Sequence, residues 1–440
     1  MNGELSADVA SVCANVPTYS SQASRRAAIG ATIGNIMEWY DFAVYGFFSI
    51  TIAKLFFPTG NELTSILLTV GTFGVGFFMR PVGAIILGAY SDRHGRKAGL
   101  MITIVLMALG TALIGFAPTY ATAGIAAPLV IVVARLLQGF SAGGEVGGST
   151  ALLVEYAPPG RRGLYGSLQQ ASAGAALLLG SMIGAILTGL LSTGQMNAWG
   201  WRVPFLLGLA IGPIGLWIRR NMDESPSFLA QCTTLKTPLA STLGDHGREV
   251  FIGLAVTIAW TVCTYCFLIY MPTYAVRQLH LSQSSSLLAN GIGLLAVMIL
   301  APVFGGWSDR VGRRLPMLIA ASAMIVLTYP LFLWITAAPS FTSLVTVQII
   351  FGTLTAMYTG PAPTMLSELF PTSVRSTGLS LAYNFAVTIF GGFAPFIATS
   401  LIAWSGSNLA PTYYVIAANA VSLLAVALLI NRSNETQYPA

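Results

Sequence analysis

The segment GAYSDRHGRK at residues 88–97 recurs as GGWSDRVGRR at residues 305–314, 217 positions later in a chain of 440 residues. A second pair repeats at a separation of 213: EYAPPGRRGLYGS begins at Glu155 and ELFPTSVRSTGLS begins at Glu368. Both separations are close to half the length of the chain. The sequence therefore predicts two homologous halves that follow one another in the chain.

The composition indicates the medium in which these halves fold. Hydrophobic residues make up 55% of the chain and charged residues only 8%, whereas soluble domains carry about a quarter charged residues. A transmembrane helix needs about 20 apolar residues, and the apolar runs here are long and lack the alternation of barrel strands. We predict an all-α polytopic membrane protein and exclude both a soluble domain and an outer-membrane barrel.

Apolar windows between charged or Pro/Gly-rich breaks predict twelve transmembrane helices in two pseudo-symmetric six-helix bundles. The first six spans are expected near residues 28–56, 63–90, 98–118, 124–153, 164–193 and 201–219. The other six are expected near 249–277, 285–307, 315–337, 341–367, 377–403 and 411–430.

These spans divide the chain into five regions. The regions are an amino-terminal tail at 1–27, a bundle at 28–219, a linker at 220–248, a second bundle at 249–431 and a short tail at 432–440. The first 27 residues are polar and lack an apolar core with a cleavage site, so we expect no cleaved signal peptide.

The basic residues predict the orientation of the spans. With a cytoplasmic amino terminus, 16 of the 21 Lys and Arg residues lie on the cytoplasmic side, and three lie near the outer face, which fits the positive-inside rule. The 16 are Arg25, Arg26, Arg93, Arg96, Lys97, Arg161, Arg162, Arg219, Arg220, Lys236, Arg248, Arg310, Arg313, Arg314, Arg375 and Arg432. This bias accounts for the net charge of +6 without a nucleic-acid partner, and we expect both termini in the cytoplasm.

The repeated pattern G-x-x-x-D-R-x-G-R-R/K, between spans 2 and 3 and again between spans 8 and 9, resembles the signature loop of the major facilitator superfamily. Four further stretches of the chain resemble the metabolite:proton symporter family of this superfamily. These stretches are GNIMEWYDFAVYGFF, FFMRPVGAIILGAYSDRHGRK, RLLQGFSAGGEVGG and WGWRVPF. Within that family the chain most resembles citrate and tricarballylate:proton symporters, through IAKLFFP, GAYSDRHGRKAGLMIT and TAAPSFTSL.

The resemblance implies a proton-coupled secondary active transporter of the bacterial inner membrane that works by alternating access. The implied partners are protons, a small carboxylate such as citrate or a related tri- or dicarboxylate, and the lipid bilayer. It implies no cofactor, no metal and no catalytic residue, and a monomer is sufficient for the cycle. Other substrates of the family, namely 2-oxoglutarate, shikimate and proline or betaine, stay open, as does a proton-driven efflux antiporter.

The loop motifs predict a salt-bridge latch on the cytoplasmic side. Asp92 and Asp309 lie at helix ends beside arginines, where the helix dipole favours such charges. The alternative is a basic loop that only sets topology. The expected gating residues are Asp92, Arg93, Arg96, Glu155, Arg162, Asp309, Arg310, Arg313, Glu368 and Arg375. Among them, Glu155 with Arg162 and Glu368 with Arg375 are expected to belong to the same cytoplasmic network.

Five charged residues lie deep in the spans of the first half: Glu38, Asp41, Arg80, Arg135 and Glu145. A charge at mid-bilayer costs several kcal/mol and persists mainly when it is paired or lines a water-filled path. The alternative for each residue is that it forms a buried ion pair with a purely structural role.

By resemblance to sugar:proton symporters, Asp41 and Arg135 pair in proton coupling. We expect Asp41 to exchange the proton, with Glu38 and Glu145 as rivals, because burial disfavours a charged carboxyl group and a nearby guanidinium favours it. Arg80, together with Arg135, is expected to bind a substrate carboxylate through its planar fork.

The second half is expected to supply neutral contacts, with Tyr265, Tyr358 and Asn384 as substrate-binding candidates beside Tyr270 and Gln348. For each of these the alternative is a core polar group with an internal partner. Lys54 either draws anions toward the outer face or extends to the interface. No G-x-x-x-x-G-K-[ST] motif, nucleophile-base set or metal cluster occurs, so we expect neither an ATP-driven pump nor an enzyme.

Overall fold

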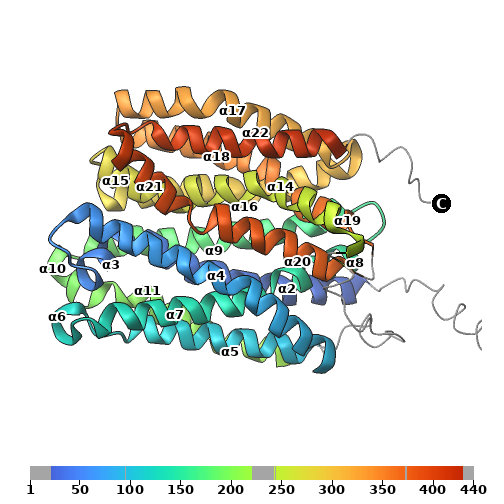
Figure 1. Ribbon diagram of the computed structural model, residues 1–440, viewed down its shortest axis with the longest axis horizontal. Coiled ribbons are helices and arrows are strands. Elements are labelled where there is room, and N and C mark those ends of the chain that lie inside the picture. The colour runs from blue at the N-terminus through green and yellow to red at the C-terminus, as the bar shows by residue number, and fades with distance from the viewer. Residues whose placement is uncertain (1–20, 95, 221–241, 243, 372–373, 430–440) are drawn as a thin grey trace, which may run out of the picture.

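The computed structural model describes residues 21–94, 96–220, 242, 244–371 and 374–429, and throughout these residues its regular structure is helical. Figure 1 shows the helices lying side by side between two ends of an elongated bundle. We call the end at which α4 and α16 run into the two repeated loops the motif end, and the end that carries α3, α6, α10 and α15 the opposite end.

The first half contains eleven described elements. They are α2 (Ser21–Phe47), α3 (Ser49–Phe56), α4 (Glu62–His94), α5 (Arg96–Gly115), α6 (Tyr120–Ala123), α7 (Ala126–Gly143), α8 (Val146–Glu155), α9 (Arg162–Leu190), α10 (Thr193–Gln195), the π-helical η1 (Met196–Gly200) and α11 (Arg202–Arg220).

The second half also contains eleven. They are α14 (Gly247–Cys263), η2 (Thr264–Tyr270), α15 (Met271–Gln278), α16 (Gln283–Val311), α17 (Arg314–Ala337), α18 (Phe341–Thr359), α19 (Ala362–Glu368), α20 (Arg375–Ala386), η3 (Val387–Gly391), α21 (Ala394–Ser405) and α22 (Ala410–Leu428).

The predicted all-helical membrane fold is confirmed. Among the described residues, ten helices or helix runs are long and apolar enough to cross a membrane, and a shorter apolar helix spans Met101–Gly115 within α5. Together with α2 they account for the twelve predicted spans. Most of the predicted linker and of both tails lies outside the described residues.

Several spans that the sequence predicts as continuous are interrupted. The fourth span breaks between α7 and α8 at Gly144–Glu145, and the tenth breaks between α18 and α19 at Gly360–Pro361. The seventh and eleventh contain the π-helical segments η2 and η3. Glycine and proline weaken the helical hydrogen-bond ladder at such points, and π-helical turns are frequent at functional sites.

Backbone contacts between glycines set the spacing of helices in both halves. In the first half Gly76 of α4 lies against Gly139 of α7, so that a Cβ on Gly139 would collide with the Gly76 carbonyl. The same contact recurs in the second half between Gly293 of α16 and Gly352 of α18. These pairs are related by the separations of 217 and 213 found in the sequence, so the repeat extends to the packing of the helices.

The two halves touch at both ends of the bundle. At the motif end Gly163 of α9 lies against Gly305 of α16. Toward the opposite end the Ser181 hydroxyl donates to the Leu287 carbonyl at 2.7 Å, and the Ser284 hydroxyl donates to the Ala185 carbonyl at 2.9 Å. The helices α9 and α16 therefore form a long seam between the halves, with the charged centre described below on its α2, α4 and α7 side.

We expect Gly139→Val to destabilise the protein by about 3 kcal/mol, because overpacking against a backbone that cannot move forces the helices apart. The melting temperature of the purified protein in detergent measures this. Gly148→Val is the matched control in the same span, since a Cβ at Gly148 meets no atom within 4 Å. Equal melting temperatures for the two variants would contradict the glycine contact.

Candidate binding and proton-coupling site

The five deep charges predicted from the sequence are all buried in the first half. Glu38 and Asp41 lie on α2, Arg80 lies on α4, Arg135 lies on α7, and Glu145 lies at the break between α7 and α8. None has more than 5% of its surface exposed, and both arginines are completely buried. The close approach of α4 and α7 positions the arginines, because the Arg135 backbone packs on Gly76 and the Arg80 backbone packs on Gly143.

Arg80 is held by an ion pair and by aromatic rings. Its Nη2 donates to Oε1 of Glu38 at 2.6 Å. Its guanidinium carbon lies 4.8 Å from the ring centre of Phe42 and 4.7 Å from that of Phe77, within cation–π range. Its Nε and Nη1 are buried and have no hydrogen-bond partner among the described residues.

Arg135 has a similar aromatic setting but a neutral hydrogen-bond partner. Its Nη1 donates to Oε1 of Gln138 at 2.7 Å. Its guanidinium carbon lies 4.6 Å from the centre of the Phe42 ring, 4.7 Å from that of Tyr45 and 5.0 Å from that of Phe73. The Nε and Nη2 atoms, one edge of the guanidinium, are buried without a partner in the described part of the chain. Phe42 therefore contacts both cations.

Asp41 and Arg135, which are expected to pair in proton coupling, are joined indirectly in this structure. Over the described residues the two side chains form no ion pair, although each acts on the charge of the other. Asp41 instead accepts a hydrogen bond from the hydroxyl of Thr111 on α5. Gln138 Nε2 donates to that same hydroxyl oxygen at 3.1 Å, so two neutral side chains stand between the carboxylate and the guanidinium.

Glu145 belongs to a different level of the bundle. Its Oε2 accepts from the hydroxyl of Thr103 at 3.4 Å. Thr103 precedes Thr111 by eight residues on α5, which corresponds to about 12 Å along the helix. Glu145 is thus displaced from Asp41 toward the motif end.

The second half brings two tyrosines to the arginines. Tyr265 of η2 and Tyr383 of α20 are both buried and both interact with the charge of Arg80. The Tyr265 ring lies 5.4 Å from that of Phe77, centre to centre, and its hydroxyl has no hydrogen-bond partner within the described residues. Tyr265 is one of the substrate-binding candidates predicted from the sequence, whereas Tyr383 is not among them.

Asn384 also lies at the junction of the halves, where its Nδ2 donates to the Gly143 carbonyl at 3.3 Å. Tyr358 does not reach this centre: its hydroxyl donates to the Val256 carbonyl at 2.7 Å, inside the second half. Gln348 and Tyr270 likewise have partners within that half. The depth of a residue in a span can be counted from the sequence, but the sequence does not show which face of the helix meets the other half. This is why Tyr358 is predicted as a substrate contact although it lies away from this centre.

The motif end carries a network that crosses between the halves. The Asp309 carboxylate accepts from the backbone N–H of Gly163 at 2.8 Å and of Leu164 at 3.0 Å, at the amino terminus of α9. Arg313 donates to Asp309 at 2.6 Å and reaches Glu368 at 3.2 Å. One acidic residue of the second half thus caps a helix of the first half, where the helix dipole favours it.

Two acidic residues of the predicted cytoplasmic network form ion pairs that the sequence repeats alone do not specify. Glu155 pairs with Arg375 of the other half at 3.6 Å rather than with Arg162, whose carbonyl accepts from Thr364. Glu368 pairs with Arg313 rather than with Arg375. Because both repeats end at the same end of the bundle, the nearest partner can come from the other copy. Arg310 is exposed, and the side chains of Asp92, Arg93 and Arg96 lie outside the described ones.

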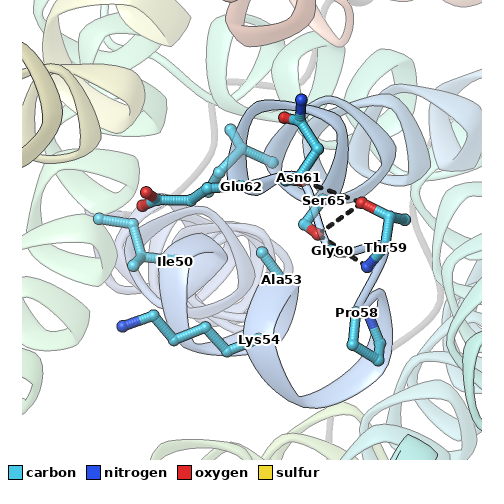
Figure 2. Close-up of a pocket in the computed structure, with 10 residues that line it drawn as sticks. Ile50, Ala53, Lys54, Pro58, Thr59, Gly60, Asn61, Glu62 and Ser65 are labelled. Carbon is cyan, nitrogen blue, oxygen red and sulfur yellow. Dashed lines mark hydrogen bonds between the residues drawn. The ribbon is translucent and has the colours of Figure 1, made fainter.

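The opposite end is also closed by contacts between the halves. Arg277 of α15 pairs with Glu62 of α4 at 3.2 Å, and Ser49 and Thr273 share a hydrogen bond of 2.9 Å. Beside them lies a pocket of about 270 Å³ lined by Lys54, Pro58, Glu62 and their neighbours. In Figure 2 the ends of Lys54 and Glu62 extend to one side of this pocket, while Thr59 and Ser65 bond to each other on the other side.

The aromatic rings around the arginines and the two neutral residues Thr111 and Gln138 are not among the residues predicted from the sequence. Two local features of the sequence indicate that Phe42 and Gln138 lie near the site. Phe42 directly follows Asp41 in the stretch EWYDF, and Gln138 lies three residues after Arg135, on the same face of α7.

We expect Asp309→Asn to loosen the motif end, because the amide keeps the shape but loses the charge-assisted bonds to α9 and Arg313. A cysteine at buried Ser167, in a chain whose four native cysteines are replaced by alanine, should then react about tenfold faster with a maleimide, as expected for about 1.5 kcal/mol. Glu62→Gln, at the opposite end, is the control and should leave the rate unchanged. Equal rates in all three proteins would contradict the latch.

Comparison with known proteins agrees with this architecture. The family model of the Major Facilitator Superfamily matches residues 31–395 and 288–438. The citrate-proton symporter of Salmonella typhi is 38% identical over 95% of this chain and 96% of its own length. The alpha-ketoglutarate permease of Escherichia coli is 34% identical over 96% and 98%, and the Escherichia coli proline/betaine transporter is 32% identical over 91% and 82%.

Solved structures show the same fold. The proton:xylose symporter XylE superposes with a TM-score of 0.78 at 19% identity, over 94% of this chain and 96% of that chain. A partially occluded inward open conformation of XylE from E. coli gives a TM-score of 0.76 over 96% and 100%. Family and relatives are transporters and not enzymes, and they place the chain in the bacterial inner membrane as a multi-pass protein. The chain belongs to the Major Facilitator Superfamily.

Proposed function

We propose that this protein is a proton-coupled symporter that imports a small carboxylate, citrate or a related tri- or dicarboxylate, by alternating access. One observation carries the proposal: two completely buried arginines lie at the junction of the halves, and each has two guanidinium nitrogens that lack a well-aligned hydrogen bond to any described residue. Buried donors without a partner cost about 1–3 kcal/mol each, and more when charged. A bound anion would remove that cost.

The guanidinium edges suit carboxylates. Arg135 has its Nε and Nη2 edge open, which can hold one carboxylate through two parallel hydrogen bonds. Arg80 offers Nε and Nη1 separately, because its Nη2 is bonded to Glu38. The unpartnered Tyr265 hydroxyl adds a neutral donor from the second half. Two cationic anchors favour a substrate with at least two carboxylates.

The relatives support this chemistry. The citrate-proton symporters and the alpha-ketoglutarate permease are named for polycarboxylates, and the proline/betaine transporters are named for zwitterions with a single carboxylate. A site with two arginines fits the first group better than the second. The other family substrates and a proton-driven efflux antiporter are outcomes of the experiment below.

We assign the proton exchange to Asp41, with Glu38 and Glu145 as the alternatives. Asp41 is the deep carboxylate joined to Arg135 through hydrogen bonds, whereas Glu38 is committed to Arg80 by a short ion pair. Loss of the Asp41 charge would leave Arg135 less compensated and so more attractive to an anion. Binding of proton and substrate would then favour each other, as symport requires.

The orientation completes the proposal. The motif end faces the cytoplasm with both termini, which is supported by the 16 basic residues assigned to that side and by the positive-inside rule. We also propose that the amino-terminal tail, the first bundle, the linker and the second bundle end at residues 27, 219, 248 and 431. We further propose that a monomer is sufficient for the transport cycle.

The test is uptake of labelled citrate, tricarballylate, 2-oxoglutarate and betaine into proteoliposomes with an imposed pH gradient. We expect accumulation of the tri- and dicarboxylates in the direction of proton flow, and little of betaine. Flux of all four that ignores the gradient would overturn the proposal. Movement against the direction of proton flow would favour the antiporter instead.

We expect Arg135→Lys to raise the substrate KM by tenfold to a hundredfold, because a lysine cannot form the two-bond fork, whose loss costs about 1.5 to 3 kcal/mol. Arg202→Lys is the control, since Arg202 donates to the carbonyls of Ala117 and Ala198 away from the site. An Arg135→Lys protein with an unchanged KM would remove Arg135 from the substrate site.

We expect Asp41→Asn to abolish accumulation driven by the pH gradient while exchange of labelled for unlabelled substrate continues, because exchange needs no net proton movement. Glu38→Gln and Glu145→Gln should keep gradient-driven accumulation above that of Asp41→Asn. Full accumulation by the Asp41→Asn protein would move the proton to one of the other two carboxylates.

A further inference from the structure

A hydrogen-bonded chain joins the assigned proton site to the assigned substrate site across three helices. Arg135 of α7 donates to Gln138, Gln138 donates to Thr111 of α5, and Thr111 donates to Asp41 of α2. Gln138 and Thr111 are buried as completely as the charges they connect. Nothing in the proposed function itself requires either of these neutral residues.

The direction of each bond is fixed by chemistry. A guanidinium only donates, so the amide oxygen of Gln138 must face Arg135 and its NH₂ must face Thr111. A hydroxyl has one proton to give and can accept two hydrogen bonds. While Thr111 accepts from Gln138, its single proton can go to Asp41 or to the Met107 carbonyl, which lies 3.0 Å from the Thr111 oxygen.

These two acceptors match the two protonation states of Asp41. When Asp41 is ionised, Thr111 donates to it. When Asp41 is protonated, its own O–H can donate to Thr111, and the Thr111 proton turns to the Met107 carbonyl. In both arrangements every group of the chain stays bonded and no heavy atom has to move.

We propose that Thr111 is a positioning residue whose hydroxyl switches between Asp41 and the Met107 carbonyl, so that Asp41 binds and releases the proton in place while Gln138 keeps Arg135 fixed. This inference rests on the proposed role of Asp41. Around Asp41, α7 contributes the charge of Arg135, and the neighbouring Tyr40 donates to the Pro204 carbonyl of α11 at 2.9 Å. Gly208 is the α11 residue packed on the carboxylate.

The repeat provides a matched control. Thr328 and Met324 of α17 lie 217 residues after Thr111 and Met107, and the Thr328 hydroxyl donates to the Met324 carbonyl at 2.6 Å. Thr328 is as buried as Thr111. It keeps the backbone bond of the switch but forms no other side-chain hydrogen bond with the described residues, so its replacement measures the structural cost of losing a buried hydroxyl.

The experiment compares Thr111→Val, Thr111→Ser and Thr328→Val with the unmodified protein, by the pH dependence of tricarballylate binding in detergent and of its uptake. Thr111→Val removes the bond to Asp41 in both protonation states. Because the charge-assisted bond to the ionised form is the stronger of the two, the midpoint of both profiles should rise by about one pH unit, a tenfold change in proton affinity. Thr111→Ser should restore the midpoint, and Thr328→Val should leave it unchanged. The titration of the ligand itself is the same in all four proteins.

Three results would overturn the switch: an unchanged midpoint in Thr111→Val, the same midpoint in Thr111→Ser as in Thr111→Val, or an equal shift in Thr328→Val. A folded Thr111→Val protein is recognised by a melting temperature close to that of Thr328→Val. If the unmodified protein shows no uptake driven by the pH gradient, the proposed function fails instead, and that outcome is visible before any variant is compared.

Discussion

The burial of two guanidinium charges in an apolar bundle is the constraint on which the rest of this structure depends. A charge at such depth costs several kcal/mol unless its surroundings replace water. Here one ion pair, one amide and a set of aromatic rings replace it in part. The compensation is incomplete, because four guanidinium nitrogens stay without a described partner. Buried hydrogen-bond donors without a partner lower the stability of the protein. The unpartnered guanidinium nitrogens are therefore the strongest indication of a binding site.

The helix packing that holds these charges is symmetric, whereas the charges are not. The contact of Gly76 with Gly139 recurs as Gly293 with Gly352. At the positions that correspond to Arg80 and Arg135 by the same separations, the second half has Val297 and Gln348. One scaffold is thus built twice, and among the described residues only its first copy carries charged side chains at depth. The second copy presents Tyr265 and Tyr383 to them.

Some features of this structure can be predicted from the sequence and others cannot. An apolar run of about 20 or more residues predicts a membrane-spanning helix, so the twelve spans could be predicted, and the depth of Glu38 or Arg80 in its span follows by counting residues. Contacts between neighbouring helices leave no such pattern in the sequence. The exchange of partners that joins Glu155 to Arg375, and the hydrogen bonds through Thr111 and Gln138, depend on how helices distant in the chain rotate and approach. A buried threonine in an apolar run looks the same whether it bonds a carboxylate or only its own helix.

Both arginines belong to one half, and Phe42 contacts the two of them from the same half. The cationic part of the site is therefore a rigid cradle on α2, α4 and α7. If the halves rock against each other, an anion in this cradle travels with its charge partners, and at this site only the contacts with Tyr265, Tyr383 and Asn384 have to break. No salt bridge to the bound anion is then pulled apart, and the ion pairs that rocking must break are confined to the two ends of the bundle.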